Sequence, residues 1–210
     1  MLIEDDDIAR MIEASGKVGG RNKSQDLFRY IDIHGNDYDV KAEHINNYIE
    51  EALDVRYTAK AFRTWSASWK TGARFALVAT ASENLIANIP KLTKKELTRV
   101  EGTEEEPIII WRNTQLKRPE ALAKLAKAGK LQGQSESERL ATMLAVIDTV
   151  AGDLGNTRAV CRTSYIRPMF LEDWMSGKFE NRWDNASTLK RIPGLNRAES
   201  TAVHYMRVHE

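Results

Sequence analysis

Apolar side chains recur every three or four positions along most of the chain, which is the spacing of an amphipathic helix. This pattern predicts helices over residues 5–14, 41–53 and 58–81 in the first part of the sequence. Further along it predicts a helix over 135–152, where Ser135 and Glu138 have the spacing of a capping box. Two more helices are expected over 170–177 and 187–209, joined by a polar loop at 181–185.

One stretch has a clear strand pattern: residues 27–33, followed by Gly35 and Asn36, predict a strand that enters a turn. Residues 82–133 are less regular, with a cluster of glutamates at 101–106, a short apolar strand at 108–111 and a basic helix at 119–130. We interpret them as an inserted segment with a surface loop. The expected fold class is mainly α-helical with a small β element near the N-terminus, in one domain that spans residues 1–210.

The composition agrees with a folded domain. The chain has 210 residues, of which 42% are hydrophobic and 29% charged, and this excludes wholesale disorder and fibrous structure. Its longest apolar runs fall far short of a membrane-spanning helix. The acidic start at residues 4–7 is unlike a signal peptide, so we expect neither export nor membrane contact.

Cysteine and histidine usage indicates a protein without a metal. Cys161 is the single cysteine, so no internal disulfide is expected. The four histidines are scattered without a ligand motif, at His34, His44, His204 and His209. The net charge of +1 neither predicts nor excludes a nucleic-acid partner, because a local patch decides this.

The helix predicted over 58–81 has two unlike faces. Its apolar face carries Phe62, Trp65, Trp69 and Ala76, and its opposite face carries Lys60, Arg63, Lys70 and Arg74. Residues 56–74 include five basic side chains and no acidic one. Such a stripe would attract a polyanion, and the alternative is an ordinary solvated helix face.

Residues 155–168 carry the strongest chemical signal, with three arginines, no acidic residue and the tyrosine Tyr165. A tyrosine that acts as a nucleophile at neutral pH needs cationic neighbours to stabilise its phenolate and the charge that develops on phosphorus. Composition alone leaves the alternative of a packing tyrosine with a solvated hydroxyl.

Two segments together resemble a known family. Residues 57–65 read Tyr-Thr-Ala-Lys-Ala-Phe-Arg-Thr-Trp, and residues 154–168 read Leu-Gly-Asn-Thr-Arg-Ala-Val-Cys-Arg-Thr-Ser-Tyr-Ile-Arg-Pro. In residue types and in order they resemble the type IB DNA topoisomerases, in particular the bacterial, poxvirus-like branch. Residues 26–32, 39–40 and 45–49 are similar to the stretch that precedes the first motif. The resemblance covers about residues 5–80 and 136–170.

The resemblance implies a helical catalytic domain that attacks one strand of duplex DNA, forms a 3′-phosphotyrosyl bond, relaxes supercoils and reseals the strand. It implies Tyr165 as the nucleophile, Arg63 on the scissile phosphate and Asn156, nine residues before the tyrosine, as a donor to a phosphate oxygen. Lys60 would support the phosphate. No metal or ATP is implied as a cofactor.

Other basic residues are candidates for contacts with the DNA backbone, which position a duplex without reading its bases. They are Lys70 and Arg74 on the basic stripe and Arg162 and Arg167 beside the tyrosine. The expected partner is duplex DNA, bound by a monomer in the cytoplasm, in association with the nucleoid if the source is bacterial.

The chain also departs from the family pattern. The family's set includes another arginine and a lysine on a β-hairpin that serves as general acid, and both are expected upstream of residue 1, together with the DNA-clamping domain. The chain therefore resembles a C-terminal catalytic portion. Lys17 occupies a different place in the order and takes no role.

Three other interpretations stay open at this point. A tyrosine recombinase shares the chemistry, but usually has His-x-x-Arg where residues 60–63 read Lys-Ala-Phe-Arg. A catalytically silent DNA-binding fragment would bind with a steep salt dependence and form no adduct. A helical interaction domain with a packed Tyr165 would not bind DNA.

Overall fold

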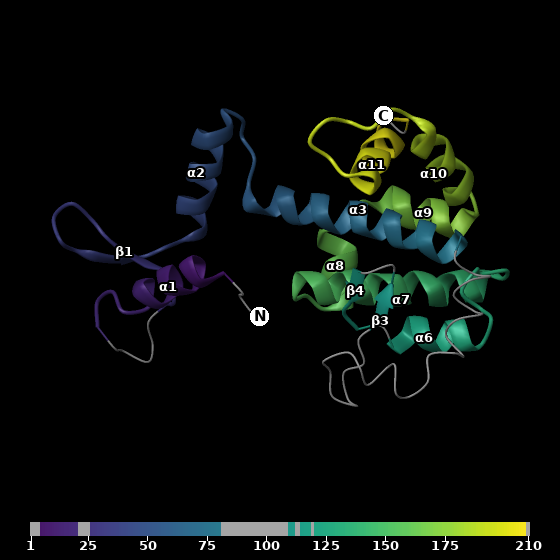
Figure 1. The fold of residues 1–210 in the computed structure, drawn as a ribbon, viewed down its shortest axis with the longest axis horizontal. Coiled ribbons are helices and arrows are strands. Elements are labelled where there is room, and N and C mark those ends of the chain that lie inside the picture. The colour runs from purple at the N-terminus through teal and green to yellow at the C-terminus, as the bar shows by residue number, and fades with distance from the viewer. Residues whose placement is uncertain (1–4, 21–25, 81–108, 112–113, 119, 209–210) are drawn as a thin grey trace. The chain divides into compact units, whose positions relative to one another are not determined.

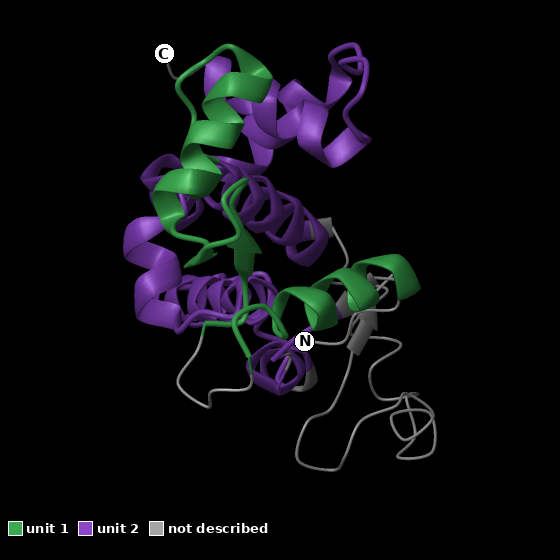
Figure 2. Cartoon of the chain, turned by 90° about the vertical axis from the view of Figure 1, so that its left-hand side faces the viewer, with its two compact units in different colours: residues 1–61 green, residues 62–210 purple. Residues whose placement is uncertain are grey.

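A computed structural model describes residues 5–20, 26–80, 109–111, 114–118 and 120–208 (Figure 1). The described chain is mainly helical with a small antiparallel sheet near the N-terminus, which confirms the predicted fold class. It forms two compact units, residues 1–61 and residues 62–210 (Figure 2). That the two act as a single catalytic domain stays a prediction.

The first unit contains the helices α1 (Asp6–Ser15) and α2 (Ala42–Leu53) and the strands β1 (Arg29–Ile31) and β2 (Asp37–Asp39). Asp5 begins α1 because its carboxylate accepts hydrogen bonds from the backbone N–H groups of Asp7 and Ile8, both at 3.0 Å. The strands pair as an antiparallel hairpin with Tyr30 opposite Tyr38. Both helices and the strand that enters a turn were predicted from the sequence.

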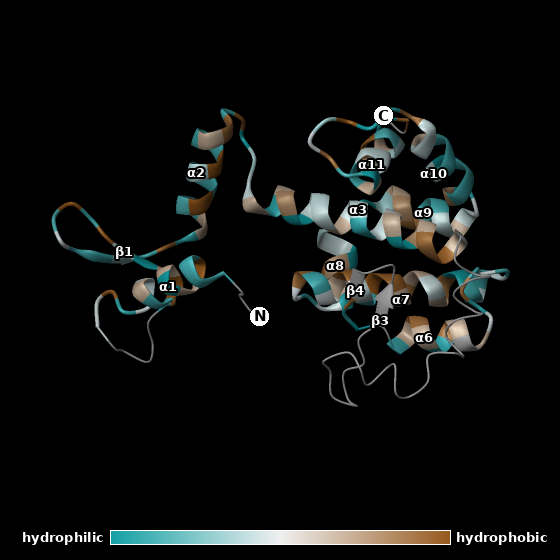
Figure 3. Cartoon of the chain, in the orientation of Figure 1, coloured by the Kyte–Doolittle hydropathy of each residue, from teal (hydrophilic) through white to brown (hydrophobic). Residues whose placement is uncertain are grey.

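Surface ion pairs link the elements of this unit. The Arg29 guanidinium contacts Asp37 and, at 2.9 Å, Asp39, and Lys41 lies 3.0 Å from Asp26 and 3.2 Å from Asp39. The hydrogen bond from Lys41 lowers the pKa of the Asp39 carboxyl below its ordinary value. None of the described residues of the first unit is buried. Figure 3 shows apolar segments along its helices and hairpin.

The second unit takes in α3 (Ala59–Thr80) from Phe62 onward. It continues with the hairpin β3 (Ile109–Trp111) and β4 (Thr114–Leu116), α6 (Glu120–Lys127), α7 (Glu136–Leu154) and α8 (Arg158–Ser164). It ends with α9 (Pro168–Ser176), α10 (Phe179–Thr188) and α11 (Arg197–Arg207). The short strand and the basic helix predicted within 82–133 are thus confirmed, whereas residues 82–108 lie outside the described residues. None of the described helices is long and apolar enough to cross a membrane.

Helix α7 runs through the core and contacts α6, α8, α9 and β4. Ser135 begins it, as predicted, by accepting a hydrogen bond from the Glu138 N–H at 3.3 Å. Its side chains are buried on several faces, with Val146, Ile147 and Val150 fully inaccessible. A layer of aromatic rings completes the core: Phe75 stacks on Trp174 at 4.5 Å between ring centroids, and Phe179 stacks on Trp183 at 5.5 Å.

The C-terminal prediction was wrong in two places. Residues 181–185, expected as a polar loop, lie inside α10, because Phe179 and Trp183 anchor that helix in the core. The helix expected over 187–209 begins only at Arg197, after a non-helical segment that contains Pro193 and Gly194. Three buried residues at helical spacing, Phe179, Trp183 and Ala186, hold α10 in place, and the expected loop was inferred from the polar residues between them.

Candidate active site

Tyr165 lies directly after α8, where the backbone leaves the helix. Its neighbours on both sides are fixed in the core, since Cys161 is inaccessible and Ile166 is 4% exposed. Pro168 then opens α9 at the first helical position, where a missing N–H costs nothing. Tyr165 is thus held half-buried between two short helices. Burial also raises the pKa of the nearby Cys161 thiol to about 11.

Ser68 of α3 supports the backbone on both sides of the tyrosine. Its hydroxyl donates to the Tyr165 carbonyl at 3.4 Å and accepts from the Arg167 N–H at 3.1 Å. Ser68 is 1% exposed, so these bonds form away from water. The sequence analysis did not single out this residue, because a serine within a helix has no signal in the hydrophobic pattern.

Arg63 lies against the tyrosine ring. Its guanidinium carbon is 5.0 Å from the centroid of the Tyr165 ring, and one terminal N–H donates to the Leu154 carbonyl at 2.8 Å. A guanidinium carries five N–H donors in a fixed fork, and this carbonyl uses one of them. The structure thus brings together two of the three predicted catalytic residues.

Asn156, the third, lies in the turn that joins α7 to α8. Its N–H donates to the Ala151 carbonyl at 2.8 Å, while Gly155 takes a positive φ of 65°. Its side-chain nitrogen Nδ2 is buried and has no hydrogen-bond partner among the described residues. A buried unsatisfied donor costs about 1–3 kcal/mol, so this amide would gain from an acceptor.

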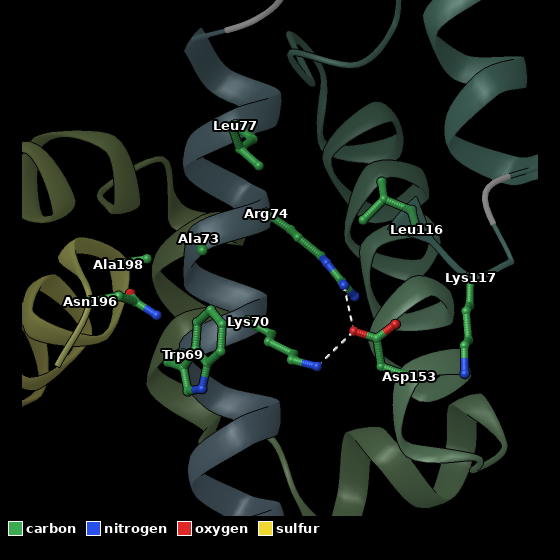
Figure 4. Close-up of a pocket in the computed structure, with 10 residues that line it drawn as sticks. All are labelled: Trp69, Lys70, Ala73, Arg74, Leu77, Leu116, Lys117, Asp153, Asn196 and Ala198. Carbon is green, nitrogen blue, oxygen red and sulfur yellow. Dashed lines mark hydrogen bonds and ion pairs between the residues drawn. The ribbon is translucent and has the colours of Figure 1, made fainter. Parts of the chain in front are cut away.

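Lys70 and Arg74 do not lie on an open cationic face, and this corrects the expected stripe. Both contact the carboxylate of Asp153 near the end of α7, Lys70 at 2.9 Å and Arg74 at 2.6 Å (Figure 4). Arg74 is only 7% exposed and also donates to the Thr149 hydroxyl at 3.1 Å. The periodicity located Arg74 on the helix, but could not reveal an acid that lies opposite it in space.

The apolar face of α3 needs a smaller correction. Trp65, Trp69 and Ala76 pack against the core as predicted, but Phe62 is 51% exposed. Lys60 is exposed in the first turn of α3 and belongs to residues 1–61.

A hollow of about 660 Å³ lies beside the tyrosine. Tyr165, Arg162 and Arg167 line it, together with Thr64 and the carboxylate-bearing Glu172. Both arginines are exposed, so their charges face solvent. In the part of the chain that the structure describes, no three His, Cys, Asp or Glu side chains gather where they could hold a metal ion.

These groups suit the binding of a phosphate: a guanidinium and a tyrosine in contact, an unsatisfied amide, and two exposed arginines beside a hollow. The family model described as eukaryotic DNA topoisomerase I, catalytic core, matches residues 10–172, which is 163 of the 210 residues. No curated protein matches the chain.

The chain therefore belongs to the family of the DNA topoisomerase I catalytic core, of type IB. The class suggested by the two sequence motifs is confirmed. The matched range contains Arg63, Asn156 and Tyr165. DNA is the substrate that this family implies, whereas the roles of individual residues stay predictions.

Proposed function

We propose that this chain is the catalytic region of a type IB topoisomerase that cleaves one strand of duplex DNA with Tyr165 and then reseals it. The observation that carries the proposal is the contact between the Arg63 guanidinium and the Tyr165 ring, 5.0 Å from its centroid. Tyr165 also lines the hollow that Arg162 and Arg167 share, so the ring that Arg63 contacts borders a space with further cations.

The proposed step is an in-line displacement at phosphorus. The phenol oxygen of Tyr165 forms a bond to the phosphorus, the bond from phosphorus to the 5′ oxygen breaks, and a proton passes overall from the phenol to that oxygen. The products are a 3′-phosphotyrosyl ester and a 5′-hydroxyl. Because the ester conserves the energy of the broken bond, resealing needs no ATP.

Two side chains are proposed to stabilise the charge on the phosphate. Arg63 would bind non-bridging oxygens with the N–H groups that the Leu154 carbonyl does not use. The Nδ2 of Asn156 is buried in this structure and would donate to another such oxygen once its side chain turns toward the phosphate, which would end its unsatisfied state. Preorganised donors of this kind contribute most when charge develops at the reacting group.

Exposed arginines would hold the flanking DNA. Arg162 and Arg167 line the hollow beside Tyr165, and Lys60 at the start of α3 is proposed as a further phosphate contact. Lys70 and Arg74 contribute less in this account, because Asp153 already neutralises part of their charge.

The finer placement within the family is also part of the proposal. The motifs favour the bacterial, poxvirus-like branch, and a monomer acting on duplex DNA in the cytoplasm. The family match favours a topoisomerase over a recombinase. The general-acid lysine and the further arginine that the family uses have no assigned counterpart in residues 1–210.

Covalent trapping tests the proposal. The chain would be incubated, with EDTA and without ATP, with a duplex whose released 5′-hydroxyl fragment is short enough to diffuse away and whose retained fragment carries the label, and then resolved on a denaturing gel. A second duplex carries sulfur in place of the 5′-bridging oxygen, since this leaving group needs no general acid. Tyr165→Phe is compared with Tyr48→Phe, which removes an exposed hydroxyl from residues 1–61.

We expect an adduct with the wild type and with Tyr48→Phe, and none with Tyr165→Phe. A strong preference for the sulfur substrate would show that the chain by itself lacks a general acid. A folded wild type that binds DNA but forms no adduct on either substrate would contradict the proposed activity and favour a silent DNA-binding fragment.

A further inference from the structure

Asp153, near the end of α7, forms ion pairs just before the turn that leads to the proposed site. Its carboxylate is 13% exposed and accepts from two cations of α3, Lys70 at 2.9 Å and Arg74 at 2.6 Å. Figure 4 shows the carboxylate between the two side chains, at the wall of a hollow of about 600 Å³. An ion pair that is mostly shielded from water is screened less than one on the surface, so this contact ties α7 firmly to α3.

The residues that follow Asp153 carry the groups of the proposed site. Leu154 supplies the carbonyl that holds Arg63, at 2.8 Å. Asn156, three positions after Asp153, carries the buried amide that has no hydrogen-bond partner in the described parts of the chain. The same short turn therefore joins the arginine of α3 to the amide before α8.

A second contact holds the turn from the β4 side. Arg118 donates to the Asn156 carbonyl at 2.6 Å. The backbone approaches closely here, since a Cβ added to Gly152 would lie 2.8 Å from the Cβ of Lys117. The turn is thus held at Asn156 from the β4 side and tied to α3 at two places, by the Arg63 bond to the Leu154 carbonyl and by the ion pairs of Asp153.

We propose that Asp153 is a positioning residue, which holds the turn 153–156 against α3 so that Arg63 and the Asn156 amide face the same phosphate. The inference rests on the proposed function and extends it to a residue that does not touch the DNA. Displacement of reacting groups by about 1 Å can cost roughly 100-fold in rate. Loss of the carboxylate is thus expected to slow cleavage by roughly 10- to 100-fold.

Two other roles for the same contacts make different predictions. If Lys70 and Arg74 bind DNA directly, removing the acid that neutralises them should tighten binding and steepen its salt dependence. If the ion pair only stabilises the fold, its loss should reduce activity in proportion to the fraction unfolded.

The test compares Asp153→Asn with Asp173→Asn in the full chain. Asp173 is similarly buried and contacts Arg182 and Tyr205 of α10 and α11, so its loss disturbs the same unit away from the turn. The cleavage rate is measured in single turnover on the sulfur-containing duplex, below the unfolding transition of every variant. DNA affinity is measured in a Tyr165→Phe background at several salt concentrations.

A readout without DNA completes the design. The side-chain Nε–H NMR signal of Arg63, assigned with Arg63→Lys, reports whether the guanidinium keeps its place beside the Leu154 carbonyl. We expect Asp153→Asn to slow cleavage, to leave affinity within about twofold, and to shift the Arg63 signal. Asp173→Asn should change neither rate nor signal, and Asp153→Glu, which keeps the charge, should recover part of the rate.

Tighter binding with an unchanged cleavage rate in Asp153→Asn would overturn the proposal in favour of direct DNA contacts. An equal loss of rate in both variants, with the Arg63 signal unmoved, would reduce Asp153 to a stabilising role. If the wild type itself forms no adduct, the proposed function fails. The Arg63 signal then decides the positioning role alone, and an unshifted signal in Asp153→Asn overturns it.

Discussion

Residues 1–61 and residues 62–210 contain similar elements that are held together in different ways. In the second unit Phe75, Ile147 and Phe170 are fully inaccessible, and the helices share one core. In the first unit none of the described residues is buried, and Tyr48 and Ile33 are 71% and 95% exposed. Caps, a hairpin and surface ion pairs define its elements. An amphipathic pattern therefore predicts a helix whether or not the apolar face of that helix is covered.

The units also differ in charge. Residues 1–61 contain 13 Asp or Glu against 8 Lys or Arg, a net of −5, and residues 62–210 contain 17 against 23, a net of +6. The proposed nucleophile and its arginines thus lie in the cationic unit. The net charge of the whole chain, +1, does not reveal this difference between the units. Attraction to DNA is expected from the second unit.

Amide hydrogen exchange should show the largest difference between the units. Local opening costs between about zero and the full free energy of unfolding, depending on how many buried contacts an element has. Amides of α7 should therefore exchange several orders of magnitude more slowly than those of α2. The exchange is measured by mass spectrometry on the full chain. Equal protection of the two helices would contradict the claim that the two units differ in buried contacts.

The next largest effect is expected when an aromatic side chain in the core of the second unit is truncated. The Phe75 ring stacks on Trp174 and meets Phe179 edge-on at 5.4 Å. Removal of such a ring leaves a cavity, so Phe75→Ala should lower the free energy of unfolding by about 3–5 kcal/mol. Urea denaturation measures it, and a loss below about 1 kcal/mol would show that the core of the second unit is not closely packed.

Tyr205→Phe should have a smaller effect that depends on pH. The phenol donates to Asp173 at 2.5 Å, and a hydrogen bond to a charged group contributes about 1.5–3 kcal/mol. Burial, followed by the bond to Asp173, raises the pKa of Tyr205. Near pH 7 the wild type should be more stable by that amount.

Above about pH 10, the ordinary pKa of a tyrosine, the unfolded phenol ionises while the folded one stays neutral. The advantage of the wild type over Tyr205→Phe should therefore shrink as the pH rises further. Urea denaturation at pH 7 and pH 10.5 measures the difference. An advantage that grows with pH would contradict the burial of this hydroxyl.

The smallest effect is expected in the first unit. Tyr48 lies on α2 and is largely exposed, so Tyr48→Ala should change the free energy of unfolding by no more than about 0.5 kcal/mol. A loss comparable to that of Phe75→Ala would show that this face is covered by other parts of the protein in solution.

Much of the fold follows from the sequence because local rules determine it. Apolar spacing predicts α2, α3 and α7, and residues 27–36 predict the strand β1 and the turn after it, whereas the partner strand β2 was not predicted. Helix α10 was missed, although Phe179, Trp183 and Ala186 have helical spacing, because the polar residues 181–185 between them were interpreted as a loop. Local helix propensity does not show which distant segments of the chain cover such buried side chains.

The candidate site was predictable only in part. Motifs identified Arg63, Asn156 and Tyr165, and the structure places the first against the last. The contacts of Arg74 could not be found, because Asp153 is 79 residues away in the chain. Periodicity gives the direction of a side chain on its own helix, but contacts between distant segments arise from tertiary packing.

The central claim is that Tyr165 forms a covalent bond to DNA. Mass spectrometry of proteolysed protein after reaction with the sulfur-containing duplex tests it most directly. We predict a nucleotide attached through its 3′ phosphate to the peptide that contains Tyr165. Attachment to another residue, or through a 5′ phosphate, would contradict the account.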